Sequence, residues 1–224
     1  MPRISRTPRA CSPWQGFGRI VVRMKAPIDF HFDFSSPYSY IANEWIDALA
    51  ARHGRTVRRH AILLGATFAV AELKSPVSYP LKRDYALRDF QRSAGFERVP
   101  YVQPEPFPVP TQNAARVFWW LKDREGEAAA AAWVRAGFRA FFTRGVPLND
   151  PAALKALVAE AGLDADAAEA AWNHPMWKER LKRANDEAIA AGVFGAPWFV
   201  IDGEPFWGND RKPQIEQWLA SGPF

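Results

Sequence analysis

The residues best suited to chemistry are two serines that flank a proline and a tyrosine, in the order Ser36-Pro37-Tyr38-Ser39. Ser36 and Ser39 occupy the positions that the two thiols fill in a Cys-Pro-x-Cys redox motif. A hydroxyl cannot exchange with a disulfide, because it carries no sulfur. It can donate a hydrogen bond to a bound thiolate and so lower the pKa of that thiol. The motif therefore predicts a site whose sulfur is brought by a bound molecule.

The elements on either side must position Ser36. Residues 28–34 alternate apolar with polar side chains, and this period of two predicts a strand. The Ser-Ser-Pro sequence is a typical helix start, and an apolar stripe predicts a helix over 38–52. At such a junction, free backbone N–H groups and a partial charge of about +0.5 favour an anion. Alternatively, Ser35 or Ser36 is simply the helix N-cap, and a cap at Ser35 would leave the hydroxyl of Ser36 free.

The rest of the chain predicts an α/β protein built on one interrupted sheet. A second strand is expected within 56–64, parallel to the first through a right-handed crossover. A strand led by Pro197, a hairpin at Asp202-Gly203 and a helix over 211–220 close the chain. Asn209 or Asp210 is expected to cap that last helix. The order β-α-β, helices, β-β-α predicts a thioredoxin-like sheet with a large all-helical insertion.

We expect the sheet domain to be divided in sequence, with residues 26–65 and 184–224 on either side of a helical insertion at 66–183. Five prolines between 97 and 111 predict an extended loop within the insertion. Large aromatic residues are expected to fill the core of the helical layer rather than to line a substrate wall. They are Trp119, Trp120, Trp133, Phe138, Phe141 and Phe142.

Composition and charge argue against two classes of partner. The longest apolar runs are shorter than the roughly 18 residues that a membrane span needs, so no membrane is expected. The net charge of +5 is concentrated in residues 1–25, and the remaining sequence is close to neutral. This distribution argues against nucleic acid as a partner.

Residues 1–25 are basic, lack acids and contain no continuous apolar run, so they do not resemble a secretory signal. They resemble either a transit peptide or an upstream extension of the reading frame, with Met24 as the working start. We favour the extension, and we treat the segment as disordered or mis-started and separate from the fold.

No metal site is expected from the cysteine and the histidines. The single cysteine, Cys11, can form neither an intramolecular disulfide nor a cysteine-rich metal site, and this low cysteine content fits a reducing cytoplasm. The histidines show no metal-ligand spacing, and each is expected to be solvated or hydrogen-bonded. They are His31, His53, His60 and His174.

Several separated motifs resemble the 2-hydroxychromene-2-carboxylate isomerases and their relatives, the kappa-class glutathione transferases. The motifs are FDFSSPYSYIA at 32–42, FPVPTQNAAR at 107–116, GVFGAPWFV at 192–200 and FWGNDR at 206–211. The resemblance extends from about residue 27 to the end. It implies a thioredoxin-like fold, glutathione as cofactor, a small aromatic substrate and a cytoplasmic enzyme, and it allows a homodimer.

The resemblance also implies a glutathione site. Ser36 matches the serine that holds the glutathione sulfur. Pro197 matches a cis-proline, and the backbone of Ala196 before it matches the segment that pairs with the glutathione cysteine. Asn209 and Asp210 match positions that hold the γ-glutamyl end.

From the insertion, Lys82 and Tyr85 resemble residues that contact the tripeptide. Lys82 is also our candidate partner for a substrate carboxylate. The aromatic substrate is expected near Tyr38, Phe107, Trp198 and Trp207.

The expected activity is glutathione-dependent cis-trans isomerisation of 2-hydroxychromene-2-carboxylate or a similar aromatic-derived pyruvate. The thiolate would add to a conjugated carbon, the bond would rotate, and the thiol would leave. A kappa-like glutathione transferase or peroxidase would use the same thiolate site. A non-catalytic thioredoxin-fold binding module would keep the sheet but need no polar pocket.

Overall fold

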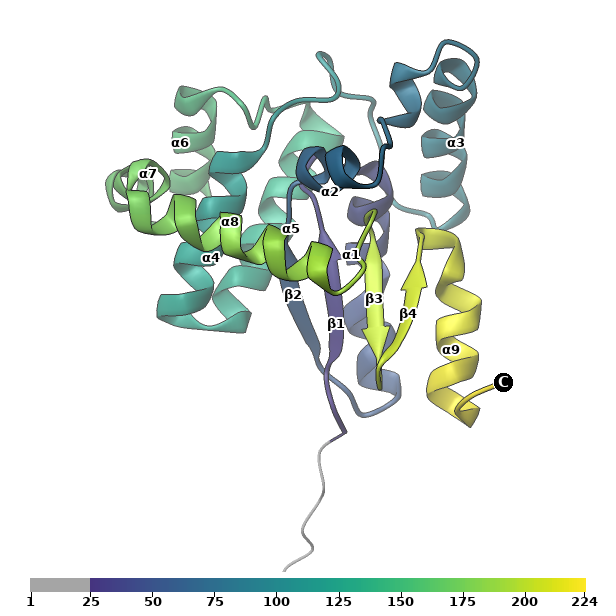
Figure 1. Cartoon of the computed structure of the whole chain (residues 1–224). Helices are drawn as coiled ribbons and strands as arrows, with labels where there is room; N and C mark the ends of the chain where they lie inside the picture. Colours follow the sequence, from purple (N-terminus) through teal and green to yellow (C-terminus); the bar gives the residue numbers. More distant parts are fainter. Residues whose placement is uncertain (1–24) are drawn as a thin grey trace, which may run out of the picture.

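The computed structural model describes residues 25–224, and a four-stranded mixed sheet lies at their centre (Figure 1). The strand order is β2-β1-β3-β4. β1 pairs in parallel with β2 and antiparallel with β3, and β3 pairs antiparallel with β4. The strands are β1 (Ile28–Phe32), β2 (Val57–Ala61), β3 (Trp198–Ile201) and β4 (Glu204–Trp207). The predicted thioredoxin-like order of elements is confirmed.

Two turns in the sheet domain follow directly from the sequence. Asp202 and Gly203 have φ values of 54° and 91°, the left-handed conformation that a two-residue hairpin turn requires, so the predicted hairpin is confirmed. β1 ends at Phe32, two residues before the predicted end. The chain turns there because the Asp33 carbonyl accepts a hydrogen bond from Ser36 N–H at 3.0 Å.

Helices cover both faces of the sheet. α1 (Pro37–Arg52) connects β1 to β2, and its Trp45 ring lies 5.4 Å from that of Phe199 in β3. α9 (Lys212–Ser221) lies beside β4, and α8 (Pro175–Ala190) crosses the opposite face (Figure 1). This layering leaves the carboxyl end of β1 and the start of β3 at one edge, where α1 begins.

The segment between β2 and β3 is helical, as predicted. Its helices are α2 (Leu64–Val70), α3 (Arg83–Phe96), α4 (Gln112–Glu125), α5 (Glu127–Arg144), α6 (Pro151–Glu160), α7 (Ala165–Asn173) and α8. The predicted proline-rich loop joins α3 to α4, and the expected domain boundary at residue 183 falls within α8.

One hydrophobic core joins the sheet to the helical segment. Every aromatic residue predicted to fill the helical layer is at most 5% exposed. The Phe34 ring continues this core from the end of β1 and packs against Trp133 and Phe138 of α5. A Cβ at Gly137 would lie 2.8 Å from the Phe34 ring, so glycine permits this close approach.

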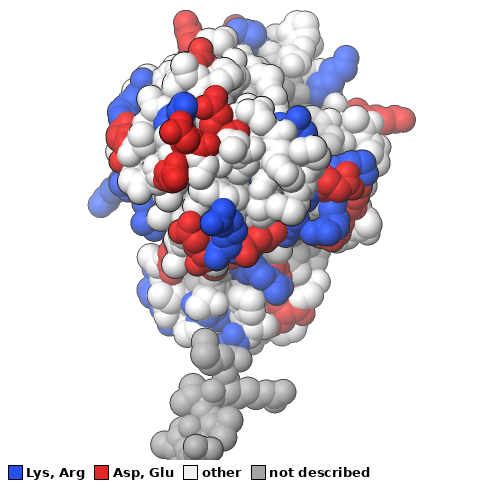
Figure 2. Space-filling view, turned by 90° about the vertical axis from the view of Figure 1, so that its left-hand side faces the viewer, with Lys and Arg blue, Asp and Glu red and all other residues white. Residues whose placement is uncertain are grey.

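The surface shown in Figure 2 carries interspersed acidic and basic side chains. Across residues 25–224, no helix combines the length and apolar character that crossing a bilayer requires. Apart from Lys25, the expectation for residues 1–25 lies outside the described residues.

Candidate active site

A cavity of about 1070 Å³ opens where the end of β1, the start of α1 and the segment before β3 meet. Its apolar wall includes Phe68 of α2, Phe90 of α3 and Val109 of the proline-rich loop. Most of the predicted site residues line it together. These are Ser36, Tyr38, Tyr85, Phe107, Ala196, Pro197, Trp207, Asn209 and Asp210.

Ser36 is 4% exposed and is the N-cap of α1. Its Oγ accepts a hydrogen bond from Ser39 N–H at 3.1 Å and donates one to Ala196 O at 3.3 Å. Of the two candidate caps, Ser36 is confirmed and Ser35 is not, because Ser36 Oγ holds the N–H of the first turn and the Ser35 hydroxyl instead donates to Asp33 Oδ1 at 2.9 Å. A single hydroxyl, that of Ser36, therefore caps the helix and faces the segment before β3.

The first turn of α1 has fewer free backbone N–H donors for an anion than most helix starts have. Pro37 has no N–H, Ser39 N–H is used by Ser36, and Tyr40 N–H bonds to Ser36 O at 3.0 Å. Of these first positions in the described chain, Tyr38 N–H remains. No acidic residue lies within this turn, and the nearby Asp33 carboxylate accepts from Ser35 N–H at 2.8 Å, just before the helix begins. The Ser36 hydroxyl, Tyr38 N–H and the helix end can act on the same anion.

The segment opposite Ser36 contains a cis peptide bond between Ala196 and Pro197. Pro197 O accepts a hydrogen bond from Gly208 N–H at 3.0 Å, which ties this segment to the end of β4. A Cβ at Gly195 would lie 2.5 Å from Trp207 Nε1, so the indole lies directly against this backbone. Trp207 is 51% exposed and forms part of the cavity wall.

Asn209 and Asp210 lie at the cavity rather than capping the last helix. Asn209 is buried, and its Oδ1 accepts a hydrogen bond from Trp45 Nε1 at 2.8 Å. The predicted cap is wrong because a 3₁₀ turn, Asn209–Arg211, precedes α9, and neither side chain bonds to the helix start. The Asp210 carboxylate is mostly exposed and pairs with Arg211, whose Nη2 lies 2.6 Å from Oδ2.

Tyr38 and Asp89 form a polar pair in an otherwise aromatic wall. The Tyr38 hydroxyl donates to Asp89 Oδ2 at 2.6 Å. Burial, followed by this hydrogen bond, raises the pKa of Tyr38 far above its usual value, so the phenol stays protonated. The Phe90 ring lies 5.1 Å from that of Tyr38 and 5.9 Å from that of Phe107.

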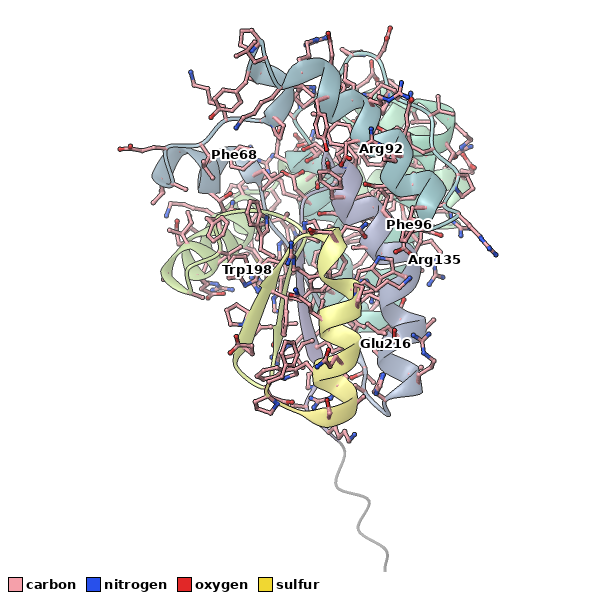
Figure 3. The ribbon with its side chains drawn as sticks, turned by 90° about the vertical axis from the view of Figure 1, so that its right-hand side faces the viewer. Phe68, Arg92, Phe96, Arg135, Trp198 and Glu216 are labelled. Carbon is pink, nitrogen blue, oxygen red and sulfur yellow. The ribbon has the colours of Figure 1, made fainter. Side chains whose placement is uncertain are left out.

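Lys82 and Trp198 do not line the cavity, and the expectation that they do is wrong. Lys82 precedes α3, and its Nζ lies 4.8 Å from the centre of the Tyr79 ring. Side chains alternate along β3, so Phe199 faces α1 and Trp198 faces the α8 side, where it packs with Phe194. Figure 3 labels Trp198 beside the strands.

Among the charged residues that line the cavity, sequence reasoning missed Asp33, Asp89 and Arg211. Asp33 is 3% exposed and accepts hydrogen bonds from Thr111 Oγ1 at 2.8 Å and Leu64 N–H at 2.6 Å. It therefore joins the end of β1 to the starts of α2 and α4. An acid at the end of the strand, separated from Ser-Ser-Pro by Phe34 alone, was a signal for this role. Nothing local indicated that Asp89 would reach Tyr38.

Outside the cavity, His31 differs from the sequence expectation. Its Nδ1 is buried and has no hydrogen-bond partner among the described residues, and its ring stacks on that of His60 at 4.5 Å. Burial, then the neighbouring His60, lowers the pKa of His31 to about 3. No group of three or more His, Cys, Asp or Glu side chains in residues 25–224 is arranged to hold a metal ion.

Comparison with known proteins links this geometry to characterised relatives. Residues 27–220 match the family described as DSBA-like thioredoxin domain. The 2-hydroxychromene-2-carboxylate isomerase of Sphingobium xenophagum is 31% identical over 88% of this chain and 99% of that relative. Glutathione S-transferase kappa 2 of Caenorhabditis elegans is 27% identical over 88% of this chain and 92% of that relative. A solved 2-hydroxychromene-2-carboxylate isomerase superimposes with a TM-score of 0.78 at 32% identity, covering 86% of this chain and 94% of that structure.

Proposed function

Because the chain belongs to the DSBA-like thioredoxin domain family, and within it to the 2-hydroxychromene-2-carboxylate isomerase family, we propose that it is a glutathione-dependent isomerase. Its substrate would be 2-hydroxychromene-2-carboxylate or a similar aromatic-derived pyruvate. The observation that carries the proposal is the Ser36 hydroxyl, which faces the Ala196–Pro197 segment inside a large cavity.

The residues of the cavity fit glutathione by their donors and acceptors. The Ser36 hydroxyl and the start of α1 suit a thiolate, and the backbone at Ala196 suits an extended peptide. Asp210 offers a carboxylate to an ammonium group, such as that of a γ-glutamyl end. Gly208 supports this position, because a Cβ there would lie 2.4 Å from Asp210 Oδ1.

Bound glutathione would supply a nucleophilic thiolate that adds reversibly to a conjugated carbon and so frees the adjacent bond to rotate. Ser36 would hold that sulfur as an anion. The Ser36 hydroxyl donates to Ala196 O at 3.3 Å, which is long for an O–H···O hydrogen bond. A bound thiolate can therefore replace Ala196 O as the acceptor at little cost in hydrogen-bond energy.

The substrate carboxylate needs a cation, and we assign it to Arg211 in place of Lys82. Arg211 is the basic residue among the described residues that line the cavity. Its guanidinium already pairs with Asp210 through Nη2, and the remaining N–H groups are suited to a second carboxylate.

The test is turnover of 2-hydroxychromene-2-carboxylate with and without glutathione, together with calorimetric titration of glutathione alone. We expect glutathione to bind and turnover to require it. A glutathione-independent rate would contradict the proposal. Glutathione binding without isomerisation, but with conjugation of an electrophile, would favour the kappa-like transferase, and no glutathione binding would favour the binding module.

A homodimer and a cytoplasmic location belong to the same proposal. The homodimer is an implication of the family resemblance. Leu81 and Phe96 are 98% and 85% exposed, but single exposed apolar side chains are common on monomers and do not argue for it. Light scattering on the purified protein measures the mass, and fractionation of cells that express it measures the location.

A further inference from the structure

One wall of the cavity carries the Tyr38 hydroxyl and the Asp89 carboxylate, two polar groups that have no role in the proposed thiolate chemistry. The two residues are 51 positions apart and meet because α1 contacts α3. Both line the cavity, beside the aromatic rings of Phe90 and Phe107. An aromatic ring of a ligand that packs against those two phenylalanines would therefore also lie beside this polar pair.

The direction of the hydrogen bonds makes this pair an acceptor. Tyr38 gives its only proton to Asp89, at 2.6 Å, so its oxygen keeps only lone pairs for a ligand. Asp89 receives further donors on the helix side, from Ser93 Oγ at 3.4 Å and Arg92 Nη1 at 3.3 Å. Figure 3 labels Arg92 on α3. The pair therefore suits a hydroxyl donor and repels a carboxylate.

The cavity also has an orientation for a ligand that carries both groups. Arg211, at the start of α9, attracts the carboxylate, whereas the acceptor pair lies on the wall formed by α1 and α3. An aromatic acid would place its ring on the apolar wall, its carboxylate toward Arg211 and any ring hydroxyl toward Tyr38.

We propose that Tyr38, positioned by Asp89, is a specificity-determining residue that accepts a hydrogen bond from a hydroxyl on the aromatic ring of the substrate. The proposal rests on the proposed function and assigns the residue that would select, among aromatic acids, those that carry a ring hydroxyl. Opening of a 2-hydroxychromene ring produces such a compound, with a phenol ortho to the side chain.

The test compares two probes that differ only in the hydroxyl, 2-hydroxycinnamate and cinnamate. Their binding is followed by tryptophan fluorescence, because Trp207 lines the cavity. We expect the hydroxylated probe to bind the wild type about tenfold more tightly, the effect of one favourable hydrogen bond to a partly buried polar pair. In Tyr38→Phe the ratio of the two dissociation constants should fall to about 1.

The matched control is Tyr101→Phe, which removes another partly buried phenol whose hydroxyl donates to Gln103 Oε1 at 2.7 Å, outside the cavity lining. In Tyr101→Phe the ratio of the two dissociation constants should stay at the wild-type value. If Tyr38→Phe does not fold, Asp89→Asn supplies the second measurement, since it removes the charge that holds the phenol. It should reduce the ratio severalfold.

A wild-type ratio near 1, failure of both probes to bind, or a tenfold ratio that survives in Tyr38→Phe would overturn the proposal. The measurement needs no turnover. Probe binding therefore tests the hydroxyl subsite alone, and the glutathione-dependent turnover assay tests the isomerase proposal separately.

Discussion

Replacing Ser36 with alanine should separate the two functions that meet at its hydroxyl. The substitution leaves Ser39 N–H without its partner in a residue that is fully buried, and it removes a donor from Ala196 O. Loss of an N-cap costs about 0.5–2 kcal/mol, and burial places this site near the upper limit. For a chain of this size, about 2 kcal/mol lowers the melting temperature by about 4–8 °C.

The effect on activity should be larger than the effect on stability suggests. A hydrogen bond to a charged group contributes about 1.5–3 kcal/mol, which corresponds to about a 10- to 150-fold loss of turnover if Ser36 holds a thiolate. The assay is glutathione-dependent turnover of 2-hydroxychromene-2-carboxylate. The ultraviolet absorbance of bound thiolate, measured against pH, should show a higher pKa for glutathione on Ser36→Ala than on the wild type.

Asp150→Ala is the matched control, because Asp150 caps α6 in the same way and does not line the cavity. Its Oδ1 accepts from Ala153 N–H at 2.9 Å on the protein surface. We expect a loss of about 1 kcal/mol in stability and wild-type turnover. Equal, small losses of turnover in the two variants, with an unchanged thiol pKa, would refute the reasoning and leave Ser36 as a cap only.

Two further predictions concern the cavity wall and His31, whose Nδ1 is buried. Gly195→Ala places a Cβ 2.5 Å from Trp207 Nε1, so the indole must move, and KM for the aromatic substrate should rise severalfold. Gly95→Ala, where a Cβ meets nothing within 4 Å, should leave KM at the wild-type value, and equal KM values in both variants would contradict the prediction. His31 has a pKa of about 3 when folded and about 6.5 when unfolded, so the unfolded chain binds the extra proton between these values. The free energy of unfolding should therefore fall by up to about 1.4 kcal/mol per pH unit as pH drops below 6.5. Urea denaturation at pH 7, 6 and 5 measures this slope, and an unchanged slope in His31→Gln would exclude His31 as its source.

The sheet and its connections could be predicted because local patterns determine them. Alternation marks β1, the Ser-Ser-Pro sequence marks the start of α1, and Asp202-Gly203 demands a tight hairpin whatever surrounds it. Most of the predicted site residues line the cavity, and the family resemblance supplied the majority of them. Many of them lie at strand ends or helix starts. Such positions meet at one edge of a thioredoxin-like sheet.

The remaining features depend on contacts that no local pattern contains. Tyr38 reaches Asp89 only because α1 and α3 pack together, and these residues belong to different parts of the chain. Trp198 was placed in the pocket by its position after Pro197, but the alternation along β3 turns it to the α8 side. Lys82 was predicted from the family resemblance and from its charge, and neither determines where its side chain points.

Helix capping and thiolate binding by Ser36 do not compete, because they use different sides of one hydroxyl. The cap uses a lone pair of Oγ, which accepts from Ser39 N–H, while the proton points toward Ala196 O. Accepting a hydrogen bond polarises an O–H group and makes it a better donor, so the cap strengthens the group that would hold the sulfur. Cysteine at this position would be a weak acceptor for Ser39 N–H and a weak donor to the ligand. A serine at this helix start therefore both stabilises the fold and keeps a donor aimed into the cavity.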